Sequence, residues 1–571
     1  SLIYGSKSKM SLLVKETQKE LREKILDALG RAVANGELPA EPLPAFNIEK
    51  PANSANGDFS SNIALAGAKA FKKAPRMIAQ SIADNIDLEG TLFEKVEIAG
   101  PGFLNFYLSQ RYYSEIVKDV ITRGEDYGAS NFGKGKKVLV EFVSANPTGP
   151  MHIGNARGGA IGDCLAAVLE KAGYNVSREF YVNDAGNQIE KFATSLEVRY
   201  LQLYKDGIEM PEDAYKGADI TEHAKSFAAE YGDKYVEAES GERRKALVDF
   251  ALPKNIAGLE RDLLQYRIKY DNWFKESTLH ADGSVAKIIE KFKELGVTYE
   301  QDGALWFKAS EFGNDKDVVL IRANGIPTYI VPDIAYHYNK LVTRGYDKAV
   351  DVLGADHHGY VPRMKAALSA LGIDENRLDC VIMQMVRLVR DGETIKLSKR
   401  SGKAITLTTL LDEIPIDAAR FFFNLREPNS HFDFDLDLAA QETSQNPVYY
   451  VQYAHARICS ILKKAQSSGI TLRTPTDEEL DLLNSPEETE LIRHLSSLTD
   501  EVITAAKTYD PARITHFVIE LATLFHKFYN AQRVIADDEG LMQARLYLCV
   551  AVKDTIKNIL TMLKISAPES M

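Results

Sequence analysis

The spacing of apolar residues changes twice along the chain. Over residues 11–35 they recur at helical spacing, and a Pro-rich stretch, a helix start and the short apolar run FLNFYL follow. From Lys137 the pattern becomes strand, loop and helix, and after Pro415 only long helical patterns remain. These changes predict three domains, with residues 1–9 expected to lie outside the fold. The predicted domains are residues 10–130, 131–415 and 416–571.

The middle domain has the pattern of an α/β protein. KVLVEFV and SREFYV are apolar and β-branched, and the runs GALWF, DVVLIR, KAVDVLG and CVIMQMVRL come after a charged helical stretch at about 188–295. Strands that alternate with helices predict a doubly wound parallel sheet of the Rossmann type, interrupted by a helical insertion. The first domain is predicted to be α+β and the last an all-α bundle.

Composition is that of an ordinary globular protein, since 45% of the 571 residues are hydrophobic and 26% are charged. No apolar run approaches the roughly 18 to 20 residues of a membrane span, and the first residues lack the pattern of a signal peptide. The four cysteines show no CxxC or CxxH spacing, so we expect neither disulfides nor a zinc site, and a cytoplasmic location. These cysteines are Cys164, Cys380, Cys459 and Cys549.

The formal net charge is −12 at pH 7, from 69 basic and 81 acidic residues. This balance argues against indiscriminate binding of polyanions. A nucleic-acid partner would therefore have to be recognised by local patches, aromatic stacking and shape.

The first candidate for chemistry is the motif HIGN at residues 152–155, at the predicted turn from the first strand of the sheet into its first helix. A helix N-terminus offers free N–H groups and the positive end of the helix dipole to a phosphate. His152 and Asn155 can donate hydrogen bonds to phosphate oxygens. Alone, the motif is equally compatible with a tight turn. Four glycines are expected to let the helix approach a nucleotide closely: Gly154, Gly158, Gly159 and Gly162.

The second candidate is the motif KLSKR at residues 396–400, followed by SGK, in a loop expected directly after the last strand of the sheet. Lys396 and Lys399 would stabilise a pentacovalent phosphate and a pyrophosphate leaving group, although a solvated basic loop is the simpler alternative. A parallel sheet brings the carboxyl ends of its strands to one crevice. The two motifs are therefore a stronger signal together than either is alone.

The two motifs resemble the HIGH and KMSKS signatures of class I aminoacyl-tRNA synthetases. Asn155 replaces the last His of the first signature, and Leu397 and Arg400 stand where Met and Ser are usual. Longer stretches are similar to arginyl-tRNA synthetases, and the similarity covers essentially the whole chain from Met10 to Met571. These stretches are EFVSANPTGPMHIGNARGGAIGD, GADHHGY, VRDGETIKLSKRSGKAITL, DAARFFFNLR and NPVYYVQYAHAR.

The resemblance implies an arginine–tRNA ligase that activates L-arginine with ATP and Mg²⁺ and transfers the arginyl group to tRNA(Arg). It implies catalytic roles for His152, Asn155, Lys396 and Lys399. It implies that ATP is bound by Gly154, Gly354, Asp356, Met385, Val386 and Ser398. It implies that arginine is bound by Glu141, Ser144, Asn146, Tyr329, Asp333 and His357. It implies that tRNA is bound by Phe103, Asn105, Tyr450, Tyr453, Arg457 and Met571.

The chemistry of arginine agrees with part of this assignment. A guanidinium is always charged and presents five donors in a rigid fork, so its pocket needs carboxylates such as Glu141 and Asp333. Taken alone, Glu141 is better explained as part of a strand-end salt bridge and Asp333 as a helix cap. Tyr450, Tyr453 and Arg457 are spaced to share one helix face, which suits stacking on anticodon bases or, alternatively, a tyrosine-rich core stripe.

Two other functions fit part of the pattern. A small-molecule adenylyltransferase would share the HIGN loop but would not need a further domain at each end. A non-enzymatic RNA-binding relative would be expected to lack Lys396 and Lys399, which are present. The insertion is helical rather than strand-rich, so no editing domain is expected, and a guanidinium-reading pocket can reject analogues without one. The protein is expected to be a monomer without a membrane partner.

Overall fold

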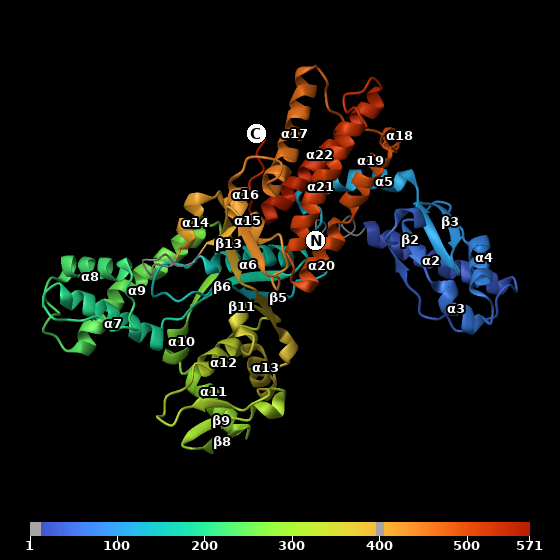
Figure 1. Cartoon of the computed structure of the whole chain (residues 1–571). Helices are drawn as coiled ribbons and strands as arrows, with labels where there is room; N and C mark the ends of the chain where they lie inside the picture. Colours follow the sequence, from blue (N-terminus) through green and yellow to red (C-terminus); the bar gives the residue numbers. More distant parts are fainter. Residues whose placement is uncertain (1–12, 396–404) are drawn as a thin grey trace.

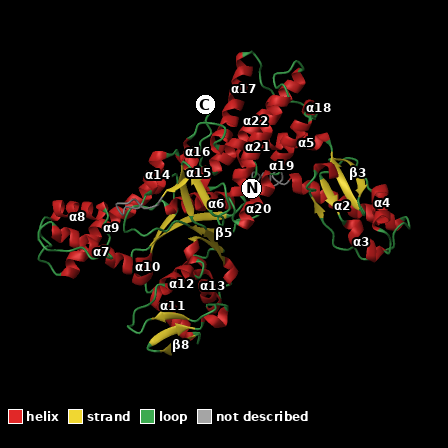
Figure 2. Ribbon diagram, viewed as in Figure 1, coloured by secondary structure: helices red, strands yellow, loops and turns green. Residues whose placement is uncertain are grey.

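The structure is a computed structural model that describes residues 13–395 and 405–571. Figure 1 shows an N-terminal domain set apart from the body, a central sheet, and a helical bundle that packs beside it. Figure 2 shows the strands gathered in the centre and in two smaller groups at the periphery. No helix in the described part of the chain is long and apolar enough to cross a membrane.

The N-terminal domain packs helices on an antiparallel sheet of strand order β1-β2-β4-β3. Helices α3 and α4 pack on the strands, and α2 packs on α4. Helix α5 instead packs against helices of the C-terminal bundle and joins the domain to the body. The elements are α2 (Leu13–Ala34), β1 (Ile48–Glu49), β2 (Phe59–Ser61), α3 (Ile63–Phe71), α4 (Pro75–Asn85), β3 (Phe93–Ala99), β4 (Phe103–Leu108) and α5 (Gln110–Arg123).

The central sheet has five parallel strands in the order β12-β11-β5-β6-β7, which confirms the predicted fold class. The first strand of this sheet in the sequence, β5, is the middle one. Strands β6 and β7 follow on one side of it, and β11 and β12 are added later on the other side. The strand order reverses between β5 and β11, which is where ligands bind in open α/β sheets. The strands are β5 (Lys137–Glu141), β6 (Asn175–Val182), β7 (Asn272–Lys275), β11 (Lys348–Gly354) and β12 (Leu378–Met383).

Helices surround this sheet and fill its long connection. Helix α6 follows β5, and α12 and α13 precede and follow β11. Helices α7, α8 and α9 have a hydrophobic core of their own and project from the body (Figure 1). These helices are α6 (Gly154–Lys171), α7 (Asn187–Gln202), α8 (Ala218–Tyr231), α9 (Ser240–Gln265), α10 (Glu276–Ala281), α11 (Ser284–Glu294), α12 (Ile330–Tyr338) and α13 (Tyr360–Ala370).

The structure differs from the predicted strand assignment at the insertion. GALWF and DVVLIR form β9 (Ala304–Phe307) and β10 (Val318–Ile321), which pair with β8 (Thr298–Gln301) in a separate antiparallel sheet. Strand β7, by contrast, belongs to the parallel sheet although it lies inside the stretch expected to be helical. Its four residues, NWFK, are too short a run to show a period.

The second motif also follows a different strand from the one predicted. CVIMQMVRL contains the end of β12 and also β13 (Val386–Arg390), which lies between β14 (Glu393–Ile395) and β15 (Phe432–Asp435) in a third sheet. KLSKR therefore follows β14 and not the last strand of the parallel sheet. Strand β15 alternates buried phenylalanines with exposed aspartates, a pattern that the expectation of helices alone after Pro415 overlooked.

The C-terminal bundle is otherwise helical as predicted. Helix α17 packs on α21 and α22, and α19 packs on α21 and on α5 of the N-terminal part. The helices after residue 405 are α14 (Leu407–Glu413), α15 (Ile416–Phe423), α16 (Leu436–Ala440), α17 (Pro447–Ser467), α18 (Asp477–Leu480), α19 (Pro486–Ser496), α20 (Leu498–Thr508), α21 (Ala512–Ala531) and α22 (Glu539–Met562).

Candidate active site

The loop after β5 begins with two residues in the left-handed region. Val143 has φ 72° and Ser144 has φ 48°. This conformation is strained for Val143, because its side chain is β-branched. The turn lets the Ser144 hydroxyl donate to Glu141 Oε2 at 2.9 Å and accept the N–H of Tyr181 at 3.1 Å. Ser144 thus fixes Glu141 at the carboxyl end of the strand. Asn146 lies further along the loop and is exposed.

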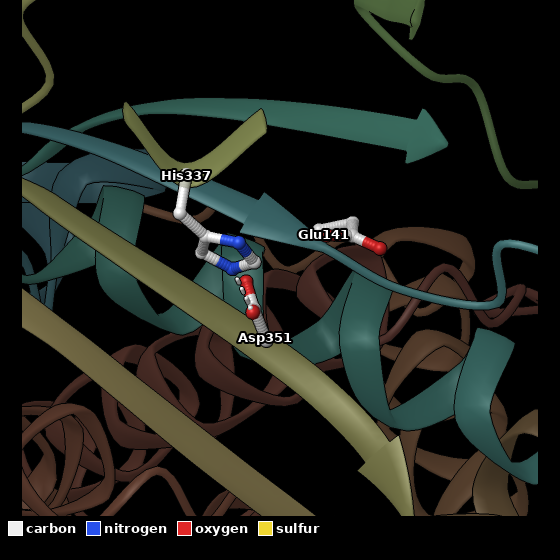
Figure 3. A group of neighbouring side chains, drawn as sticks. All are labelled: Glu141, His337 and Asp351. Carbon is white, nitrogen blue, oxygen red and sulfur yellow. Dashed lines mark hydrogen bonds and ion pairs between the residues drawn. The ribbon is translucent and has the colours of Figure 1, made fainter. Parts of the chain in front are cut away.

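A buried ionic network holds the other oxygen of Glu141. Lys340 donates to Glu141 Oε1 at 2.7 Å and to Asp351 Oδ1 at 2.9 Å. The second oxygen of Asp351 lies 2.6 Å from His337 Nε2, and His337 Nδ1 donates to the backbone carbonyl of Asp333 at 2.7 Å. Figure 3 shows Glu141, His337 and Asp351 converging from β5, α12 and β11. The network spans the point where the strand order reverses.

The hydrogen-bond pattern sets the charges of this network. Both ring nitrogens of His337 face acceptor oxygens, so an ionised Asp351 requires an imidazolium. Burial opposes ionisation of Asp351, but Lys340 and His337 outweigh it and lower the pKa of Asp351 below its ordinary value. Burial likewise opposes the charge of Lys340, while Asp351 and Glu141 raise its pKa above the ordinary value. Two cations therefore balance two carboxylates.

These three residues do not fit a metal site. Glu141, His337 and Asp351 are the one group of potential ligands close enough together in the part of the chain that the structure describes. The ammonium of Lys340 bonds to both carboxylates and already supplies the cation. A metal ion there would have to displace this ammonium.

Asp333 differs from its neighbours because its carboxylate has no hydrogen-bond or ion-pair partner among the described residues. It lies in the first turn of α12 and is half-buried. Burial raises its pKa to about 7, Glu141, Glu276 and Asp351 add to the rise, and His337 opposes it. The carboxyl group is thus only about half ionised at pH 7, and a bound cation would favour its ionised form.

Glu276 and Tyr181 complete this side of the pocket. The Tyr181 hydroxyl donates to Glu276 Oε1 at 2.7 Å, and its ring lies 4.4 Å from that of Tyr336. Tyr329 directly precedes α12, is 62% exposed, and accepts a hydrogen bond from Arg363 at 3.2 Å. This end of the sheet therefore combines buried carboxylates with one exposed tyrosine.

The HIGN turn lies at the start of α6, as predicted. His152 Nδ1 accepts the N–H of Gly154 at 2.9 Å, which leaves Nε2 as the nitrogen that carries the proton. Burial lowers the pKa of His152, so the ring is a neutral donor at pH 7. The side chain of Asn155 has no protein partner within the described ranges and is available to a ligand.

The chain after the second motif returns to this turn. Ile153 donates its N–H to the carbonyl of Ile405 at 3.0 Å, and Leu407 donates to the carbonyl of Met151 at 3.1 Å. The start of the HIGN turn is thus bonded to residues 405–407, which come shortly after KLSKR in the sequence. Lys396, Ser398 and Lys399 themselves lie outside the described residues.

The glycines of α6 differ in role from the prediction. A Cβ atom on Gly158 would meet Met383, one on Gly159 would meet Ile268, and one on Gly162 would lie 2.3 Å from Phe142. These three glycines are buried and allow the helix to pack on the protein core rather than on a nucleotide. Gly154 is exposed at the turn and remains accessible.

The remaining predicted ATP and arginine residues lie at the same sheet edge. Gly354 ends β11, and the next turn carries Asp356 and His357, which are exposed and pair with each other at 3.0 Å. Among the described residues this turn does not bond to Glu141 or Asp333, so its role stays a prediction. Met385 is 69% exposed and therefore not a core residue, and Val386 is half-buried at the start of β13.

Comparison with known proteins decides the family. Residues 116–459 match the model of the class I tRNA synthetase (R) catalytic domain, residues 19–108 the arginyl tRNA synthetase N-terminal domain, and residues 451–571 the DALR anticodon binding domain. The chain is 54% identical to the arginine–tRNA ligase of Caldanaerobacter subterraneus subsp. tengcongensis over 562 residues, which cover 98% of this chain and 100% of that one. It belongs to the arginyl-tRNA synthetase family.

Further relatives agree with this. The arginine–tRNA ligase of Ruminiclostridium cellulolyticum is 53% identical over 558 residues, which cover 97% of this chain and 99% of that one. The structure of the Thermus thermophilus arginyl-tRNA synthetase superposes with a TM-score of 0.73, covering 97% of this chain and 100% of the other. At 22% identity this last match shows that the fold is shared.

The face of α17 predicted to bind anticodon bases packs on α21 in this arginyl-tRNA synthetase. Tyr450 is half-buried and donates to Thr523 at 3.1 Å, whereas Tyr453 is 41% exposed. The guanidinium of Arg457 lies 4.0 Å above the ring of Tyr529. Only Tyr450 has the packing of a core residue, so the alternative of a core stripe does not describe the whole face.

The last residues of the chain pack beside the same helix. Gln452 and His455 of α17 bond to the carbonyls of Ser566 and Pro568, both at 2.9 Å. Met571 follows and is exposed. The tail thus lies next to α17, and a role for Met571 in this region stays a prediction.

The two N-terminal residues predicted to contact tRNA have opposite environments. Phe103 is 38% exposed at the start of β4. Asn105 is buried in the same strand, and its side-chain oxygen accepts a hydrogen bond from Ser60 at 2.9 Å. Phe103 is accessible to a partner, whereas the side chain of Asn105 is occupied within the sheet.

Several residues of the pocket were not predicted from sequence. A signal was present: Asp333, His337 and Lys340 stand at i, i+4 and i+7 and form a polar stripe on an otherwise apolar helix. Asp351 likewise interrupts the buried strand KAVDVLG, where a charge requires a partner. The functional residues missed in this way are Lys340, His337, Asp351, Glu276 and Tyr181.

Proposed function

This protein is an arginine–tRNA ligase, and we propose that it recognises L-arginine by charge at the switch point of its parallel sheet. The unpartnered carboxylate of Asp333, set beside an already balanced ionic network, is the observation that carries the proposal. Arginine brings one guanidinium, whose planar fork suits a carboxylate better than a point charge does. Tyr329 and Asp333 bind the side chain, and Glu141, Ser144, Asn146 and His357 hold the rest of the amino acid.

In the first step the carboxylate of arginine attacks the α-phosphate of ATP in line. The bond to the β-phosphate breaks, and arginyl-adenylate and pyrophosphate form. His152 Nε2 and the Asn155 amide donate hydrogen bonds as negative charge builds on the phosphate. Lys396 and Lys399 neutralise the leaving pyrophosphate. Gly354, Asp356, Met385, Val386 and Ser398 bind the nucleotide.

Mg²⁺ enters with ATP, held chiefly by the phosphates. The protein's own contribution is positioning and charge stabilisation, since no covalent intermediate with the enzyme is required.

In the second step the terminal 2′-hydroxyl of tRNA(Arg) attacks the carbonyl carbon of the adenylate. The arginyl group moves to the hydroxyl oxygen, the hydroxyl proton is lost, and AMP leaves. Tyr450, Tyr453, Arg457 and Met571 bind the anticodon end, and Phe103 and Asn105 contact the tRNA from the N-terminal domain. A cytoplasmic monomer is the form we expect to carry out this reaction.

The rival function of a small-molecule adenylyltransferase gains no support from the match of residues 451–571 to an anticodon-binding domain. The decisive assay is arginine-dependent ATP–pyrophosphate exchange, measured with and without tRNA(Arg). We expect exchange only when the tRNA is present, together with transfer of labelled arginine to it. Exchange driven equally well by another amino acid, or none under any condition, would contradict the proposal.

The Lys399→Ala variant separates chemistry from binding within the second motif. Removing one ammonium is expected to slow adenylate formation while tRNA affinity, measured by filter binding, stays within about twofold. Equal loss of both would show that KLSKR acts as a structural or RNA-binding loop.

A further inference from the structure

Lys340 is fully buried, yet its side chain ends in a charge. Its side chain is 0% exposed, and Glu141 and Asp351 are its two anionic partners. The ammonium also lies 4.3 Å from the centre of the Tyr336 ring. Burying a charged triad costs as much free energy as it returns, and apolar replacements are often at least as stable. Stability is therefore a weak reason for a lysine at this position.

The backbone at Lys340 is specialised as well. Residues Asn339–Thr343 form a π-helical turn directly after α12. Such a turn is rare and occurs frequently at functional sites. Here it follows the helix that carries Asp333 and His337, and it brings Lys340 within bonding distance of β5 and β11.

Lys340 thus connects Glu141 with the backbone of Asp333, and these are the two acidic residues assigned to the arginine side. On one side it bonds to Glu141 directly. On the other side Asp351 and His337 continue the chain to the backbone carbonyl of Asp333. Every group in this chain except the Asp333 side chain is charge-balanced by a neighbour.

We propose that Lys340 is a positioning residue of the arginine pocket, whose buried ammonium fixes Glu141 and balances Glu141 and Asp351 so that Asp333 alone awaits a cation. This inference rests on the proposed function, because it takes arginine to be the occupant. Without Lys340, Glu141 would lose its cationic partner, and Asp351 would keep only His337. The pocket would then lose a preformed acceptor, and its geometry would loosen.

Several titratable groups besides Lys340 lie near Glu141 and Asp351 and can contribute to the pH dependence of KM for arginine. The pKa of Asp333 is raised to about 7, so this carboxyl group changes charge within the range tested. Burial raises the pKa values of the surrounding tyrosines and of Cys380, so the tyrosines and the cysteine stay neutral up to pH 9. The titratable and charged groups that face Glu141 and Asp351 are His337, Lys340, Asp333, Glu179, Arg344, Glu276, Tyr181, Tyr270, Tyr336, Tyr360 and Cys380.

The test compares three variants of the full-length enzyme with the wild type in tRNA aminoacylation. Lys340→Met removes the ammonium, and Lys340→Met with Asp351→Asn removes one charge of each sign. The control, Lys348→Met, breaks the ion pair of Lys348 with Asp379, 2.8 Å apart and partly exposed at the start of β11. KM for arginine, KM for ATP and kcat are measured from pH 6 to 9.

For Lys340→Met we expect KM for arginine to rise about 30-fold or more, while KM for ATP changes less than about threefold. The KM for arginine of the double variant should be at least about tenfold lower than that of Lys340→Met. The KM of Lys348→Met should match that of the wild type. Equal losses for arginine and ATP, or a folded double variant without recovery, would overturn the inference.

If Lys340→Met does not fold, the KM for arginine of the double variant tests the inference. A KM for arginine within about threefold of wild type supports the inference, and a rise above about tenfold overturns it. Failure of the proposed function is distinguishable, because the wild type would then show no arginine-dependent charging.

Discussion

The arginine pocket and the aromatic face of α17 and α21 are built in opposite ways. In the pocket the charged side chains of Lys340, Asp351 and His337 are almost wholly buried and bonded to one another. On the aromatic face Tyr453 is exposed, and Arg457 stacks on Tyr529 without an acidic partner among the described residues. The arginine pocket thus presents charges held in fixed positions, whereas the face of α17 and α21 presents flat aromatic rings.

The difference follows from what each region is proposed to bind. Arginine is small and always charged, so a preorganised field discriminates it from neutral analogues at little cost in reorganisation. Anticodon bases are neutral and differ chiefly in their edges, so stacking supplies affinity and adaptable contacts supply selection. Removing a charge from the arginine pocket should therefore raise KM for arginine more than removing one aromatic ring raises KM for tRNA.

The largest effect is expected for Asp333→Asn. Asparagine keeps the shape of the side chain but removes the one charge left for the guanidinium, so KM for arginine should rise about 100-fold or more. Steady-state aminoacylation measures this, with KM for tRNA expected to change little. Asp206→Asn, at an exposed site in the insertion, is the control. A rise below about fivefold would show that Asp333 does not face the substrate.

Much of the fold was predictable from sequence, but the pocket was predictable only in part. The β-branched runs of β5, β6, β11 and β12 are long enough to show their period, whereas the four residues of β7 are not. GALWF and DVVLIR have strand composition, but nothing local tells an antiparallel pair from a parallel one.

Within the site, the HIGN turn was located from sequence because its chemistry depends on a local motif. The bond from Lys340 to Glu141 joins residues 199 positions apart, and no sequence spacing reveals it. The burial of Asn105 and of the α6 glycines was missed for the same reason, because both depend on which neighbours pack against them.

A smaller effect is expected on the aromatic face. Tyr453→Ala removes an exposed ring, and base stacking contributes about 1–3 kcal/mol, so KM for tRNA should rise about tenfold. KM for arginine should not change. Tyr231→Ala, which removes a ring of similar exposure from α8, is the matched control. If both variants behaved alike, the α17 face would not be a tRNA-binding surface.

Arginine binding is expected to depend on pH through Asp333. Because the pKa of Asp333 is raised to about 7, the group is mostly protonated at pH 6 and mostly ionised at pH 8. KM for arginine should therefore be about tenfold higher at pH 6 than at pH 8. Arginine should also raise the melting temperature more at pH 8. In Asp333→Asn this dependence should disappear, and its persistence would assign the titration to another group.

The smallest effects concern the N-terminal domain. Phe103→Ala should weaken tRNA binding about threefold without affecting stability, because the ring is exposed. Asn105→Ala removes a buried hydrogen bond and should lower the free energy of unfolding by about 1–2 kcal/mol. Filter binding and thermal denaturation measure the two. A loss of tRNA affinity from Asn105→Ala at unchanged stability would show a direct contact instead.

The most direct test of charge recognition compares arginine with citrulline, which has nearly the same shape but no charge. Aminoacylation rates at limiting amino acid give kcat/KM for each with the wild-type enzyme and with Asp333→Asn. The wild type should prefer arginine by a factor on the order of 10⁴, and Asp333→Asn should lose most of that preference. If the wild type used citrulline within about tenfold of arginine, or if Asp333→Asn kept the full preference, charge recognition by this pocket would be contradicted.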